Sequence, residues 1–284
     1  MSNISNAMRA EVLAHALPHI KEYAGKVVVV KYGGSAMIGE IMQNEVMKDI
    51  TLLSTVGVKV VLVHGGGPEI SELLAKTGKK SEFVGGLRVT DKETADAAQM
   101  ALAGKVGKNL ASIIGRQGGR AVSLCGLDGN IIRARQIDER LGFVGEVESV
   151  DTALIDDLLS LGYIPVIAPL GADEKGQVYN INADTAAAGI AGALRAEGLI
   201  QMTDVGGILT SRDDPDSVIS EINVSEVPLL IHNGVISGGM IPKAECCVEA
   251  IRRGVKKVFI IDGRVPHSII TELLTDEGMG TMLH

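Results

Sequence analysis

The stretch VKVVLVHGGGP, residues 58–68, decides how this chain is organised. It begins as a run of β-branched and apolar residues that is long enough for a buried strand and ends at His64. Three glycines follow, and Pro68 is placed for the start of a helix. Such a turn leaves backbone N–H groups without partners at the positive end of a helix dipole, so it suits an anion such as phosphate or carboxylate. The same glycines also fit a tight strand-to-helix connection that binds nothing.

The order of strand, glycine turn and helix recurs along the chain. Residues 27–31 form an apolar strand that runs into two glycines, and residues 199–203 form another that runs into DVGG. Helical spacing is found between the strands, as in residues 42–56 and 152–161. Repeated alternation of strands and helices predicts an α/β fold with a largely parallel sheet, helices on both faces and a ligand crevice at the carboxyl ends of the strands.

Other segments give expectations about single elements. Residues 5–23 have helical spacing with a break near Pro18, and this helix either packs on its own domain or docks on another subunit. Thr90 and Glu93 form a capping box that predicts one long Ala-rich helix reaching about residue 115. Residues 257–262 are expected to be the last strand, followed by a helix and a glycine-rich tail.

Composition limits the classes of function. The length of 284 residues predicts about two domains or one large α/β unit. A formal charge of −8, 2% aromatic residues and no Trp exclude the basic surface and stacking platforms of a nucleic-acid binder, so the ligand is expected to be small. No apolar run is long enough for a membrane span and no secretory signal is recognisable, which predicts a cytoplasmic protein without a membrane partner. Cys125, Cys246 and Cys247 have neither metal-ligand spacing nor a disulfide framework, so no metal site is predicted.

Charged residues next to the glycine turns are the candidate site residues. Lys31 ends the first strand and Lys243 opens a helix after a glycine-rich loop, so either can reach a phosphate, although both positions also suit solvated lysines. Arg88 suits bidentate binding of a carboxylate, or an ordinary surface position before a helix. Asp184 follows Asn180 and Asn182 at a helix start, where the helix dipole favours a carboxylate. The three side chains together also suit a site that holds lysines and a polar substrate in register.

Several enzyme classes are excluded by missing motifs. The sequence has no G-x-x-x-x-G-K-[ST] phosphate loop and no G-x-G-x-x-G between a strand and a helix. HGGG also occurs as an oxyanion loop in esterases, but the G-x-S-x-G elbow which that function needs is absent. Glycine turns with two lysines and an arginine suit phosphoryl transfer, where positioning and charge stabilisation dominate the barrier. No general base is evident, which favours a carboxylate acceptor because it is already ionised.

Six segments in order, VKYGG, VHGGGP, GLRVT, NINADTAA, TDVGGIL and SGGMIPK, resemble the amino-acid kinase family over nearly the whole chain from residue 27. The resemblance implies a three-layer αβα sandwich around a mainly parallel central sheet. It further implies an N-terminal helix in residues 1–24, an amino-acid-binding and dimerising lobe in residues 25–172, and an ATP-binding lobe in residues 173–284. The likeness is to members in which the γ-carboxylate of N-acetyl-L-glutamate attacks the γ-phosphate of MgATP for arginine biosynthesis, with Mg²⁺ held mainly by phosphates and water.

The motifs of the resemblance also imply roles for single residues. Lys31 and Lys243 would neutralise the transferring phosphoryl group, and Asp184 would orient the two lysines. Gly34 and Gly66 would donate backbone N–H groups to that phosphoryl group. The acetylated amino acid would be bound by Gly66, Gly67, Arg88 and Asn180, with Arg88 on its α-carboxylate. The nucleotide would face Asp204, Gly206, Gly207, Leu209, Ser237, Gly238 and Gly239.

The N-terminal helix and the tail EGMGTM resemble the members that arginine inhibits and that form hexamers as trimers of dimers. In that subtype arginine would lie between the N-terminal helix and the C-terminal lobe, near Tyr23, His267, Glu277 and Gly280. Two alternatives stay open. The chain is a related kinase for another carboxylate or for carbamate, or it is a non-catalytic arginine sensor on the same fold.

Overall fold

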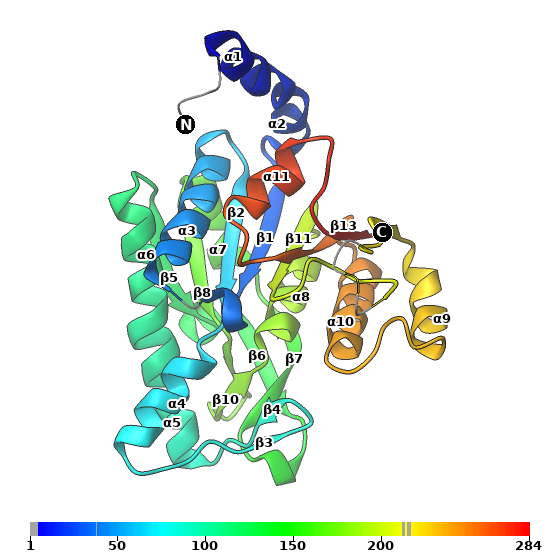
Figure 1. Ribbon diagram of the computed structural model, residues 1–284. Helices are drawn as coiled ribbons and strands as arrows, with labels where there is room; N and C mark the ends of the chain where they lie inside the picture. The colour runs from blue at the N-terminus through cyan, green and yellow to red at the C-terminus, as the bar shows by residue number, and fades with distance from the viewer. Residues whose placement is uncertain (1–4, 38, 212–213, 215–216) are drawn as a thin grey trace.

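The computed structural model describes residues 5–37, 39–211, 214 and 217–284, and its centre is one eight-stranded sheet (Figure 1). Its strands, in spatial order, are β12 (Glu221–Ile222), β14 (Thr281–Leu283), β13 (Lys257–Asp262), β11 (Gly198–Thr203), β1 (Val27–Tyr32), β2 (Lys59–His64), β8 (Ile164–Ala168) and β5 (Ala121–Cys125). All neighbouring pairs are parallel except β13 and β14, which are antiparallel. The predicted mainly parallel sheet is confirmed.

Helices cover both faces of this sheet. One layer contains α3 (Glu40–Thr55), α6 (Gly107–Arg116) and α11 (Ser268–Leu274), and the other contains α7 (Ala153–Ser160), α8 (Ala183–Ala193) and α10 (Met240–Arg252). Strand β1 contacts both helix layers, because Val28 and Val30 pack with the first layer and Val29 packs with the second. The three-layer αβα arrangement is therefore confirmed.

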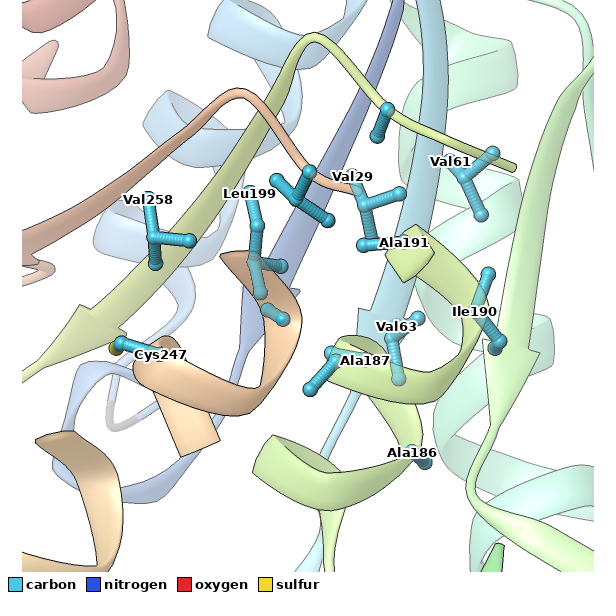
Figure 2. Close-up of a cluster of buried hydrophobic side chains, with 14 of the residues drawn as sticks. Val29, Val61, Val63, Ala186, Ala187, Ile190, Ala191, Leu199, Cys247 and Val258 are labelled. Atoms are coloured by element: carbon cyan, nitrogen blue, oxygen red, sulfur yellow. The ribbon is translucent and has the colours of Figure 1, made fainter. Parts of the chain in front are cut away.

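Helix α8 lies directly against the centre of the sheet. Figure 2 shows its small side chains Ala191 beside Val29 and Ala187 beside Val63, on the two central strands. Short side chains let a helix approach a sheet closely. This packing places the first residues of α8 beside the strand ends of β1 and β2.

Two smaller β elements are attached near the glycine-loop edge of the sheet. The strands β6 (Ile132–Gln136), β7 (Val144–Val150), β9 (Leu170–Ala172) and β10 (Val178–Ile181) form a small closed barrel, in which β6 and β7 pair antiparallel. A hairpin of β3 (Phe83–Val84) and β4 (Leu87–Arg88) follows α4 (Gly67–Lys76).

The N-terminal segment is helical with a break, as predicted. Helix α1 (Asn6–His15) begins at Ser5, whose hydroxyl accepts a hydrogen bond from the N–H of Met8, and α2 (Leu17–Tyr23) continues after Ala16 with Pro18 in its first turn. Helix α1 buries none of its side chains and stands away from the rest of the molecule (Figure 1).

Two of the expected elements are wrong in detail. The long helix consists of α5 (Lys92–Gln99), the π-helical segment η2 (Met100–Val106) and α6, and its N-cap is Asp91, because Thr90 is buried and its hydroxyl donates to the carbonyl of Arg88. The strand at residues 257–262 is not the last, since β14 in the tail pairs with it.

The remaining elements are α9 (Val227–His232) and the 3₁₀ turns η1 (Gly34–Met37), η3 (Asp128–Asn130), η4 (Glu139–Leu141) and η5 (Val224–Glu226). Among the described residues, no helix combines the length and the apolar character that crossing a membrane requires.

Candidate active site

Two glycine loops meet at the carboxyl ends of β1 and β2. The N–H of Gly65 donates to the carbonyl of Tyr32 at 2.8 Å, and a Cβ atom on Gly33 would lie only 3.4 Å from the Cα of Gly65. Gly34 and Gly66 adopt φ angles of 67° and 157°, which favour glycine. The loops therefore touch backbone to backbone, and their N–H groups share one edge of the sheet.

Asp184 joins two lysines from different elements at this edge. Its carboxylate lies 2.7 Å from the Nζ of Lys31 on β1 and 2.8 Å from the Nζ of Lys243 on α10. Burial disfavours the ionised form of Asp184, but the two ammonium groups outweigh this effect and hold the pKa of the carboxyl below its usual value. At neutral pH the cluster is a carboxylate between two cations.

One cavity of 320 Å³ opens beside Lys31 and Asp184. The cavity is lined by every residue predicted to bind the acceptor and by Gly34, the predicted phosphoryl contact in the loop after β1. These residues are Gly34, Gly66, Gly67, Arg88 and Asn180. The Nδ2 of Asn180 lies 3.5 Å from the Oγ1 of Thr90. Glycine backbone, two cationic side chains and an amide thus surround a space of the size of a small polar molecule.

Arg88 is held in a fixed position in the wall of this cavity. Its Nη2 donates to the carbonyl of Gly67 at 2.8 Å and to the hydroxyl of Ser71 at 3.0 Å, and its Nη1 donates to Ser81. The guanidinium also lies over the ring of Phe83, 4.7 Å from its centroid. A guanidinium carries five N–H donors, so the three bonds leave capacity for a ligand carboxylate.

A second cavity of 400 Å³ lies on the other side of Lys243. Five of the predicted nucleotide residues line it, namely Asp204, Gly207, Leu209, Ser237 and Gly239. Gly206 is in the same turn but is not part of this lining, and Gly238 lines an adjoining space of 680 Å³ that also contains Asp184 and Lys243. The two lysines therefore lie between the acceptor cavity and the second cavity.

The four residues predicted for arginine lie in three different places. Tyr23 and Gly280 line a cavity of 340 Å³ between α2 and the tail. His267 is separate, with its Nδ1 2.7 Å from Asp49 and its Nε2 3.1 Å from Glu45, both on α3. Glu277 lines a neighbouring cavity of 840 Å³ with residues of α1.

Sequence patterns missed the residues that support the site from behind. Ser71 and Ser81 hold Arg88, and Thr281 of β14 accepts a hydrogen bond from the N–H of Ile208 at 2.8 Å under the nucleotide-side loop. Ser71 lies one turn after Gly67 on α4, which is a detectable spacing. Ser81 and Thr281 carry no local signal, because only the tertiary fold brings them to their partners.

Comparisons with known proteins agree with this geometry. The model of the amino acid kinase family matches residues 26–262. The chain is 52% identical to "Acetylglutamate kinase" of Brachyspira hyodysenteriae, over 100% of this chain and 99% of that one.

Solved structures give the same fold. N-acetylglutamate synthase from Neisseria gonorrhoeae, with coenzyme A and N-acetyl-glutamate, is similar with a TM-score of 0.85 at 29% identity, over 96% of this chain and 63% of the synthase chain. Carbamate kinase from Giardia lamblia has a TM-score of 0.66 at 19% identity, over 92% of this chain and 99% of that one. The chain belongs to the amino acid kinase family.

Proposed function

We propose that the chain phosphorylates the γ-carboxylate of N-acetyl-L-glutamate with ATP, giving N-acetylglutamyl 5-phosphate for arginine biosynthesis. The observation that carries this proposal is the cluster of Lys31, Asp184 and Lys243 between two cavities, one lined by Arg88 and glycine N–H groups. The full-length relatives named acetylglutamate kinase, at about half identity, support the same acceptor.

The reaction needs charge stabilisation more than proton transfer. The ionised γ-carboxylate attacks the γ-phosphorus of ATP, its new O–P bond forms, and the bond to the β-phosphate oxygen breaks to release ADP. Lys31 and Lys243 neutralise the charge on the transferring group, and the N–H groups of Gly34 and Gly66 donate to its oxygens. Asp184 keeps both ammonium groups in place before the substrates arrive.

The two substrates enter from opposite sides of the lysines. Arg88 binds the α-carboxylate of the acceptor, with Gly66, Gly67 and Asn180 around the rest of the molecule. ATP lies over the turn from Asp204 and the loop at residues 237–239. We assign residues 25–172 to an acceptor lobe and residues 173–284 to a nucleotide lobe, with Asn180 reaching the acceptor cavity from the second range.

Magnesium fits this arrangement as a partner of the nucleotide. In the described residues, no group of three or more His, Cys, Asp or Glu side chains is arranged to hold a metal ion. Mg²⁺ commonly keeps several waters and binds through substrate phosphates, so it does not require such a group of protein ligands.

A coupled ADP-release assay tests the acceptor. N-acetyl-L-glutamate, glutamate, aspartate and carbamate are compared at equal concentration with MgATP, and turnover is expected with N-acetyl-L-glutamate. Preference for carbamate or another carboxylate would instead identify a related kinase. No turnover with any acceptor, together with arginine binding in calorimetry, would identify the non-catalytic sensor.

Arginine inhibition and a hexameric assembly form the second part of the proposal. The exposed apolar residues Met8, Val12 and Leu13 of α1 suit docking on another subunit, and the cavity beside Tyr23 and Gly280 lies between α2 and the C-terminal tail. Deletion of residues 1–24 is expected to keep turnover, abolish inhibition by arginine and leave dimers on a sizing column. An inhibited hexamer after the deletion would contradict this part alone.

A further inference from the structure

His64, the last residue of β2, is buried directly behind the glycine loop. Its side chain is fully enclosed, and its Nδ1 lies 2.7 Å from the carbonyl oxygen of Gly65. A carbonyl oxygen can only accept a hydrogen bond, so the proton of this bond must be on Nδ1. The contact therefore fixes the tautomer of the ring as well as its direction.

The opposite end of the ring has no competing partner. Burial lowers the pKa of His64 to about 4, so the ring is neutral at physiological pH and Nε2 carries a lone pair. In the part of the chain that the structure describes, neither Nε2 nor the nearby hydroxyl of Ser123 has a hydrogen-bond partner. Both atoms face Gly107 of α6, where a Cβ atom would come within 3.0 Å of Nε2 and 2.6 Å of the Ser123 Oγ. Among the described residues, the bond to Gly65 is thus the ring's one hydrogen bond.

The bond to Gly65 determines where the next N–H group points. In a planar trans peptide the C=O and N–H point in opposite directions. Because the carbonyl of Gly65 points to His64, the N–H of Gly66 points away from His64, and Gly66 is one of the residues that line the acceptor cavity. The N–H of Gly65, which belongs to the preceding peptide, is bonded to the carbonyl of Tyr32, so the chain that leads into the Gly65–Gly66 peptide is also held.

We propose that His64 is a positioning residue for phosphoryl transfer, which holds the Gly65–Gly66 peptide through Nδ1–H so that the N–H of Gly66 is aimed at the transferring group. This inference rests on the proposed function. A buried histidine that only fills space would need no particular donor atom, and that difference makes the two roles separable.

Amide substitutions distinguish the two ring nitrogens. Asn places its amide nitrogen the same number of bonds from Cβ as Nδ1, whereas Gln places it where Nε2 lies. His64→Asn is expected to keep kcat within about threefold, whereas His64→Gln and His64→Leu lose at least about tenfold with KM for ATP unchanged, part of the loss seen when a preorganised donor is removed. Ser123→Ala is the matched control, because it changes the other side of the ring and is expected to keep kcat within about twofold.

The kinetic result is read together with thermal midpoints of all four variants. Equal losses in the Asn and Gln variants at equal midpoints, or full activity of the Leu variant, would overturn the proposal. A measurement on the unmodified protein covers the case in which the variants fail to fold. Nitrogen NMR at neutral pH is expected to show His64 as the neutral Nδ1–H tautomer, and an Nε2–H or charged ring would refute the mechanism. Since this spectrum does not depend on turnover, it separates failure of the inference from failure of the proposed kinase activity.

Discussion

Replacing Asp184 by Asn tests the centre of the proposed mechanism. The substitution keeps the shape of the side chain but leaves the ammonium groups of Lys31 and Lys243 without the carboxylate that they share. Breaking a buried ion pair typically costs about 3–5 kcal/mol. The side chain of Lys31 is 7% exposed but that of Lys243 is 27% exposed, so solvent screens part of the repulsion. We therefore expect the free energy of unfolding to fall by about 3 kcal/mol, the lower end of that range, and Tm to fall by roughly 6–12 °C.

The kinetic effect should be on turnover and not on nucleotide binding. Without the carboxylate the two ammonium groups repel each other and leave the geometry that the phosphoryl group requires, so kcat is expected to fall on the order of 10²-fold. The KM for ATP should not rise, because the variant has removed a negative charge that faces the phosphates. The coupled ADP-release assay measures both constants. The protein contains no Trp, so Tm is measured by circular dichroism.

A matched substitution on α10 controls for the change of carboxylate to amide. Glu249 pairs with Arg253 at 2.7 Å on the surface of the same helix that carries Lys243. Glu249→Gln is expected to change stability by less than about 0.5 kcal/mol and to leave kcat intact. If Asp184→Asn melts and turns over like this control, the carboxylate does not hold the two lysines and the reasoning is refuted.

Three further predictions concern Arg88, Gly66 and His64. Arg88→Lys should raise KM for N-acetyl-L-glutamate by at least about tenfold with a smaller effect on kcat, because an ammonium cannot reproduce the planar fork; equal KM values would exclude contact with the acceptor. Gly66→Ala should cost about 1–3 kcal/mol in a denaturant titration, since its Cβ would lie 2.5 Å from Leu102 at a φ of 157°. As pH falls from about 6.5 to about 4, the unfolded chain protonates His64 while the folded chain does not. Stability should therefore fall by about 3 kcal/mol across that window, and His64→Asn should flatten the titration.

The central sheet was predictable because its signal is local. Runs of β-branched residues, glycine stops and helical spacing each fall within a few residues, and parallel strands with helical crossovers follow from their alternation. Strand β14 and the π-helical segment were not predictable in this way. Strand β14 is three residues long and exists because β13 offers it a free edge, while Leu102 and Val106 of η2 pack on Gly66, a contact that no local pattern encodes.

The site residues likewise divide into those that local sequence patterns place and those that they do not. Lys31 and the glycines lie at strand ends, and the carboxyl ends of parallel strands share one edge, so their meeting follows from the fold. Asp184 and Lys243 lie 59 positions apart on two helices, and only the resemblance to kinases linked them in advance. The residues suggested for arginine also rest on that resemblance and stay a prediction. Their signature is short, and the structure places His267 against α3 and Gly280 directly before β14.

The ion cluster also explains how an acidic protein can hold a highly charged anion. A formal charge of −8 would repel ATP at long range, so attraction has to be local. Two lysines alone would repel each other in a buried site, but Asp184 allows both to be fixed there while the cluster keeps one net positive charge. When the γ-phosphate arrives, its oxygens can take over ammonium donors that the carboxylate held, with little rearrangement of the side chains. The cost of bringing the cations together is then met during folding, before the substrates bind, and this preorganisation is the form in which electrostatic catalysis is most effective.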